Sequence, residues 1–86
     1  MDDETLRKYA FVIVSSYRTK TVKALQNDVK TPTQISTDSG IRTNHVSKVL
    51  RELKEEGMAE CINEDVKKGR LYRLTDLGEE IAENIK

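Results

Sequence analysis

The side chains best suited to specific recognition of another molecule lie between Arg42 and Arg51. They combine amide, imidazole, hydroxyl and cationic groups, at Arg42, Thr43, Asn44, His45, Ser47, Lys48 and Arg51. An asparagine amide can bond adenine through two hydrogen bonds, a lysine can reach guanine, and hydroxyl groups can bond several base edges or phosphates. Thr43, Asn44, His45, Ser47 and Lys48 are the candidates for contacts with bases. We expect Arg42 to contact a base or a phosphate, and Arg51 to contact the phosphate backbone. The alternative is the ordinary polar face of a surface helix.

Two further sets of polar side chains would extend such a surface. Lys67, Lys68 and Arg70 lie in a polar loop around a glycine, where cations could neutralise phosphates or enter a minor groove. Thr31 and Thr33 stand at the start of a predicted helix, where hydroxyl and backbone N–H groups can bond a phosphate. The alternatives are a loop kept polar for solubility and, for Thr31, a helix cap alone.

The chain offers little for catalysis or metal binding. It has no nucleophile elbow, no phosphate-binding glycine loop and no metal-ligand spacing. His45 is its only histidine, expected on an exposed face, and Cys61 its only cysteine, which excludes an internal disulfide and a cysteine-cluster metal site. We expect Cys61 to be a small buried residue. We therefore expect no enzyme activity, no metal and no cofactor.

Apolar spacing predicts five helices and a hairpin to position these residues. For example, Leu6, Tyr9, Ile13 and Tyr17 fall on one helical face. The predicted helices span about residues 6–17, 17–27, 32–40, 43–56 and 75–86, with strands at 59–63 and 70–74. The break between the first two helices is expected near Ser15.

Residues 32–56 have the pattern of a helix-turn-helix, a motif that lays its second helix in the DNA major groove. Thr31 and Gln34 can form a capping box at the start of the first helix. Gly40 marks a sharp turn that requires a positive φ. Gly57 suits the position after the second helix ends, from which Met58 can fold back onto that helix.

Charge is unevenly distributed although the 86-residue chain has no net charge. Residues 17–54 hold eight Lys or Arg against three Asp or Glu, and residues 67–73 hold four bases and no acid. Residues 55–66, between these blocks, hold five acids and no base. The two basic blocks coincide with the candidate contact residues, and local potential matters more than the total charge for a nucleic-acid partner.

A helix-turn-helix followed by a hairpin resembles the winged-helix transcriptional regulators of the MarR and ArsR type, in particular the short archaeal members. The resemblance is carried by residues 34–41 (QISTDSGI), 45–58 (HVSKVLRELKEEGM) and 69–78 (GRLYRLTDLG). It implies a mainly α fold with a small β-hairpin (α+β), the winged helix-turn-helix. A single domain, 1–86, would comprise terminal helices at 1–16 and 75–86, a helix-turn-helix at 32–56 and a wing hairpin at 59–74.

The resemblance also implies a function. The chain would bind double-stranded DNA sequence-specifically as a transcriptional regulator, which we expect to be a repressor, with residues 42–51 in the recognition helix and residues 67–70 in the wing. Neither the target sequence nor a small-molecule effector is implied. Two other classes remain open: a winged-helix adaptor that binds protein in a larger assembly, and an RNA-binding protein, disfavoured because exposed aromatic residues are scarce.

A chain of this length has a small core, so we expect a homodimer. Apolar residues on the terminal helices exceed what such a core needs, and the predicted dimer surface comprises Leu6, Phe11, Val12, Ile13, Leu77, Ile81 and Ile85. No apolar run is long enough to cross a bilayer, and the acidic start at residues 2–4 is unlike a signal peptide. We therefore expect no membrane partner and a cytoplasmic location.

Overall fold

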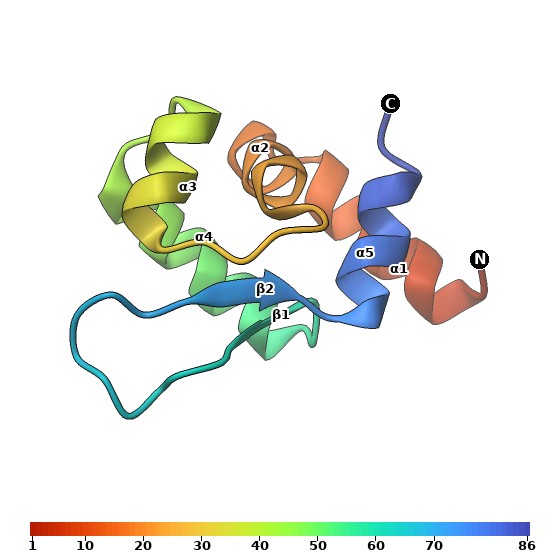
Figure 1. Cartoon of the computed structure of the whole chain (residues 1–86). Helices are drawn as coiled ribbons and strands as arrows, with labels where there is room; N and C mark the ends of the chain where they lie inside the picture. The colour runs from red at the N-terminus through yellow and green to blue at the C-terminus, as the bar shows by residue number, and fades with distance from the viewer.

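Five helices and one short antiparallel hairpin make up the chain (Figure 1). The computed structural model describes all residues, 1–86. The elements are α1 (Asp3–Ile13), α2 (Ser16–Leu25), α3 (Pro32–Ser39), α4 (Thr43–Glu55), β1 (Ala59–Cys61), β2 (Tyr72–Leu74) and α5 (Asp76–Glu83). The prediction of a mainly helical chain with a small hairpin is confirmed. None of the helices combines the length and the apolar composition needed to span a membrane.

Local side chains fix where the helices begin. Ser15 has an extended backbone, and its hydroxyl accepts a hydrogen bond from the N–H of Arg18, which separates α1 from α2 where the break was expected. The capping box predicted before α3 is confirmed: the Thr31 hydroxyl accepts from the N–H of Gln34, and the Gln34 side chain accepts from the N–H of Thr31. Each cap satisfies N–H groups that have no partner inside the helix.

Two glycines end α3 and α4 as expected. Gly40 has φ +75° in the turn between these helices, and Gly57 has φ +74° after α4. The N–H of Met58 then donates to the carbonyl of Leu53 at 2.8 Å, and the N–H of Gly57 donates to that of Lys54 at 3.1 Å. These two bonds form a Schellman motif. The chain therefore passes from α4 into β1 through a closed, hydrogen-bonded turn.

The strands are shorter than predicted because Asn63 closes the hairpin early. β1 and β2 pair only from Ala59–Leu74 to Cys61–Tyr72. Beyond them, the Asn63 side-chain oxygen accepts from the N–H of Leu71 at 2.7 Å. On the other side of β2, Tyr72 exchanges two backbone hydrogen bonds with Lys30, which precedes α3. The loop of residues 62–71 therefore leaves a sheet that is anchored to the start of α3.

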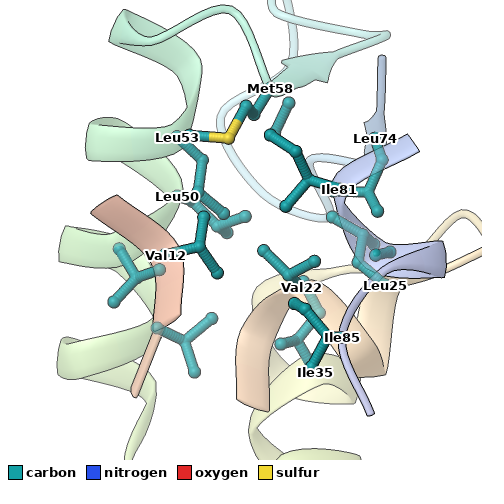
Figure 2. Close-up of a cluster of buried hydrophobic side chains, with 14 of the residues drawn as sticks. Val12, Val22, Leu25, Ile35, Leu50, Leu53, Met58, Leu74, Ile81 and Ile85 are labelled. Carbon is teal, nitrogen blue, oxygen red and sulfur yellow. The ribbon is translucent and has the colours of Figure 1, made fainter. Parts of the chain in front are cut away.

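The core is a cluster of fifteen buried apolar residues drawn from every helix and from the hairpin. Figure 2 shows Met58 beside Leu53, with Val22 from α2 and Ile81 from α5 among the side chains that converge on the same interior. Thr21 is also fully buried, and its hydroxyl oxygen has no hydrogen-bond partner. All helices thus depend on one shared interior.

Burial corrects part of the predicted dimer surface. Val12 and Ile81 are fully buried and Ile85 is 9% exposed, so the prediction that they face a partner is wrong: the chain's own helices cover them. Phe11 and Leu77 are half-buried against the core. Only Leu6 and Ile13 of the predicted set are exposed, and two other apolar side chains nearby, Val14 and Tyr17, are exposed although they were not predicted to lie at the dimer surface.

Candidate nucleic-acid interface

A cleft of about 720 Å³ lies between the start of α3, one face of α4 and the loop of residues 62–71. We call it the cationic cleft. Its lining residues are Thr31, Pro32, Thr33, Thr43, Ser47, Leu50, Arg51, Lys54, Lys67, Lys68, Gly69, Arg70 and Tyr72. Five of these are Lys or Arg, four carry hydroxyl groups on Ser or Thr, and none is Asp or Glu. Figure 1 shows the loop extending from the hairpin on the side of the molecule where α3 and α4 lie.

Helical spacing explains how α4 contributes to the cationic cleft. Thr43, Ser47, Arg51 and Lys54 follow one another at intervals of four, four and three residues, so they share one face of the helix. The neighbouring side is held in the core by buried residues that include Val46 and Leu53. The direction of the cleft face is thus fixed by the apolar residues beside it. Lys54 was not among the predicted contact residues, although its spacing from Arg51 could have identified it.

Asn44 and Lys48 lie outside the cationic cleft. Both are exposed, one turn apart, on the face of α4 beside the cleft face. Arg42 is also exposed and occupies the position before the first turn of α4, where its side chain makes no capping bond. Neither Arg42 nor Lys48 forms an ion pair within the chain. Their polar groups are therefore free to meet another molecule.

His45 does not lie on the open face expected for it. Its side chain is half-buried, and its ring centroid lies 4.8 Å from that of Tyr17 at the start of α2. Glu52, two turns further along α4, faces the same way and binds Arg18. This side of α4 is therefore used for packing against the junction of α1 and α2, and His45 belongs to that packing.

The loop of residues 62–71 is held in shape by its own side chains. The Arg70 guanidinium donates to the carbonyl oxygen of Val66 at 2.8 Å and to that of Glu64 at 3.2 Å. The Asn63 amide also donates to the carbonyl of Gly69 at 3.3 Å. Arg70, predicted as a phosphate contact, thus has two partners inside the loop. Lys67 and Lys68 are exposed at the tip, and no ion pair holds either of them.

The threonines before α3 line the opposite wall of the cleft. Thr31 is half-buried and its hydroxyl serves as the helix cap, as the alternative interpretation had it, while Thr33 is exposed. Cys61 is half-buried rather than buried, and its thiol lies 3.5 Å from the side-chain oxygen of Asn63. Cys61 is not a cleft residue.

Ion pairs neutralise four of the cations outside the cleft: Lys8 pairs with Glu56, Arg18 with Glu52, Lys30 with Asp38, and Arg73 with Glu60. Within the cleft only Lys54 has a carboxylate partner, Glu64. That hydrogen bond raises the pKa of the Lys54 ammonium and lowers the pKa of the Glu64 carboxyl. Such an arrangement can attract and hold a chain of anionic groups.

The structure thus brings together eight of the twelve residues predicted to bind DNA, namely Thr31, Thr33, Thr43, Ser47, Arg51, Lys67, Lys68 and Arg70. Of the other four, Arg42, Asn44 and Lys48 lie exposed outside the cleft, and His45 is packed against Tyr17. No known protein family, curated protein or solved structure matches this chain.

Proposed function

We propose that the chain is a winged helix-turn-helix that binds double-stranded DNA as a sequence-specific transcriptional regulator, with α4 as recognition helix and the loop of residues 62–71 as wing. The observation that carries the proposal is the cationic cleft. Five cations and four hydroxyl groups from three separate segments face one space without a carboxylate in its lining. Phosphate contacts supply most of the affinity of a protein for DNA, and they need this arrangement.

The roles follow from where each side chain lies. Asn44 and Lys48, exposed on α4, are placed to read base edges in a major groove. Arg51, Lys67 and Lys68 are unpaired cations on the two sides of the cleft, which suits them to phosphates on the flanking backbone. A protein adaptor would more often present separate patches of both signs, and a single-strand RNA binder would present exposed aromatics. Tyr72, the cleft's one aromatic residue, is half-buried.

We also propose that two copies act together through α1. Leu6, Ile13, Val14 and Tyr17 are all more than 40% exposed, with Val14 at 77%. Leu6 and Ile13 are seven residues apart and share one flank of α1, Val14 follows at its end, and Tyr17 lies at the start of α2. Exposed apolar side chains that form a patch mark an interaction surface, whereas isolated ones do not. A two-fold dimer would bind half-sites about one helical turn apart, or a multiple of that distance.

The test is a salt titration of DNA binding by fluorescence anisotropy. Replacing Lys67 and Lys68 by alanine is expected to weaken binding to every duplex and to reduce the slope of log K against log salt concentration by about 0.9 per lost contact. A matched control replaces Lys20 and Lys86, two exposed lysines outside the cleft, and leaves the slope unchanged. Equal effects of the two pairs, or no salt-dependent binding by the unaltered chain, would contradict the proposal.

A further inference from the structure

One anionic side chain reaches the cationic cleft from outside its lining. Glu64, at the start of the loop, forms an ion pair with Lys54 in the last turn of α4. Lys54 shares the cleft face of α4 with Thr43, Ser47 and Arg51. The Glu64 carboxylate therefore occupies a lysine that lines the same cleft as Arg51, one turn earlier.

We propose that Glu64 is an internal competitor of DNA. Its carboxylate takes the place of a phosphate on Lys54, and binding of a duplex exchanges the carboxylate for a phosphate. This inference rests on the proposed function, because it concerns the same cleft. Its consequence is that Lys54 can contact a phosphate only after the Glu64 carboxylate has left it. Binding to DNA of any sequence is therefore weaker than the number of cations in the cleft would allow.

The ion pair can be exchanged because it is exposed. The side chains of Lys54 and Glu64 are 52% and 56% accessible to solvent, and pairs of this kind contribute little to stability. A phosphate offers the ammonium the same kind of charged hydrogen-bond acceptor. Exchange therefore replaces one anionic partner by another and leaves no buried charge behind.

The shape of the loop does not depend on the carboxylate. Arg70 binds the backbone carbonyl of Glu64, not its side chain, and Asn63 binds the loop at Gly69 and Leu71. A glutamine at position 64 keeps all of these backbone bonds and the size of the side chain. A change in DNA affinity on this substitution would thus report the lost charge rather than a collapsed loop.

A double-mutant cycle tests the inference. The unaltered chain, Glu64→Gln, Lys54→Ala and the double variant are compared by anisotropy on a fluorescein-labelled DNA duplex of random sequence. Glu64→Gln is expected to tighten binding roughly three- to tenfold, about the gain from one additional phosphate contact, made by Lys54, at physiological salt. In the Lys54→Ala background the same substitution is expected to change affinity by less than about twofold, because the two side chains act as one unit.

Glu60→Gln is the matched control. Glu60 also pairs with a cation, Arg73, but it lies outside the cationic cleft. Its replacement removes the same charge and is expected to leave affinity within about twofold, since its distance from the bound phosphates allows salt to screen it. A similar gain from Glu60→Gln would mean that total charge, not the Lys54 pair, determines affinity.

Three results overturn the inference: a Glu64→Gln gain that persists without Lys54, weaker binding by Glu64→Gln, or no change. Weaker binding by Glu64→Gln would indicate that the Lys54–Glu64 ion pair holds the loop in place. These failures differ from failure of the proposed function, in which the unaltered chain itself shows no salt-dependent binding to the duplex.

Discussion

The backbone of Gly78 in α5 lies directly against the carbonyl oxygen of Met58, at the junction between α4 and β1. A Cβ atom on Gly78 would stand 2.1 Å from that oxygen and 3.0 Å from the Cβ of Leu74. The same oxygen accepts a hydrogen bond from the N–H of Thr75 at 3.0 Å, so it is held in place. α5 can therefore approach the hairpin this closely only because position 78 has no side chain.

Gly78→Ala is expected to destabilise the fold by about 2–3 kcal/mol, the upper range for forcing extra atoms into a packed region. Neither atom that the new methyl group would meet is the flexible end of a side chain. Urea unfolding followed by circular dichroism measures the change. Glu80→Ala, an exposed substitution in the same helix, serves as control and is expected to stay within about 0.5 kcal/mol. Equal stability of both variants would show that the hairpin can shift to make room for the methyl group at no measurable cost in stability.

Acid is expected to weaken the fold through Glu52. Hydrogen bonds from the Arg18 guanidinium to both carboxylate oxygens, at 3.3 and 3.1 Å, hold the pKa of Glu52 below its ordinary value. At pH values near the ordinary glutamate pKa and below it, the unfolded chain therefore binds more protons than the folded chain. The stabilisation is therefore complete above the ordinary glutamate pKa of about 4.3 and is lost as the pH falls through the lower pKa of the folded state.

Glu52→Gln removes this acid-sensitive contribution. We expect the free energy of unfolding of the variant to fall less than that of the unaltered chain between about pH 5 and pH 3, because the variant has one carboxylate fewer to protonate. Glu55→Gln is the control, since Glu55 is exposed and makes no ion pair. Identical pH profiles for all three chains would show that the pair with Arg18 does not matter for stability.

Thr21→Val is expected to stabilise the chain by about 0.5–1 kcal/mol. The Thr21 hydroxyl is buried without a partner, and a valine of nearly the same shape removes the cost of burying it. Thr19→Val is the matched comparison two residues earlier. The Thr19 hydroxyl donates to the carbonyl of Val12 at 3.1 Å, so its loss is expected to destabilise. Thermal or urea unfolding measures the change in the free energy of unfolding. A change of the same sign for both substitutions would contradict the expected difference.

Asn44→Ala is expected to alter sequence preference rather than general affinity. On a duplex selected from a random library by the unaltered chain, loss of the amide is expected to cost about 1–3 kcal/mol and to relax preference at one base pair. Binding to random-sequence DNA is expected to keep its strength and salt slope, because no cation is removed. An equal loss of affinity for both duplexes would indicate that Asn44 contacts the DNA backbone and not a base.

Val14→Glu is expected to convert a dimer into a folded monomer. Val14 is the most exposed of the large apolar side chains, so a charge there leaves the core unchanged but opposes an apolar interface. Sedimentation velocity at micromolar concentration distinguishes the two states, and Ser16→Glu, at an exposed polar position, is expected to remain dimeric. A monomeric unaltered chain would exclude the proposed α1 contact.

Local sequence signals predicted the bounds of α3 and the end of α4 well, whereas α1, α2 and α5 end earlier than predicted, at Ile13, Leu25 and Glu83. Thr31 with Gln34, Gly40 and Gly57 each act through neighbours within a few residues, so their roles can be derived from spacing. The chain order of helices and strands followed from the same kind of evidence. Eight residues of the cationic cleft were predicted as contact residues, but the cleft itself was not, because the α4 stripe follows helical periodicity while its distance from the loop does not.

The errors involve contacts between residues far apart in the chain. Burial of Val12 and Ile81 depends on how α1 and α5 pack, and apolar periodicity alone does not distinguish a core face from a partner-binding face. The His45–Tyr17 contact and the Lys30–Tyr72 bridge likewise join segments that only the tertiary fold brings together. The two carbonyl partners of Arg70 could not be predicted either, because they come close only once the loop has its shape.

The hydrogen-bonded turn at Gly57 and Met58 has a consequence for the kinetics of binding. Its two backbone hydrogen bonds connect α4 directly to the start of the hairpin, so under the proposed function neither element would have to be ordered when a duplex binds. Little conformational entropy is then lost on complex formation. We expect the association rate constant to be governed by electrostatic steering, decreasing steeply with ionic strength, and not by a slow rearrangement after encounter.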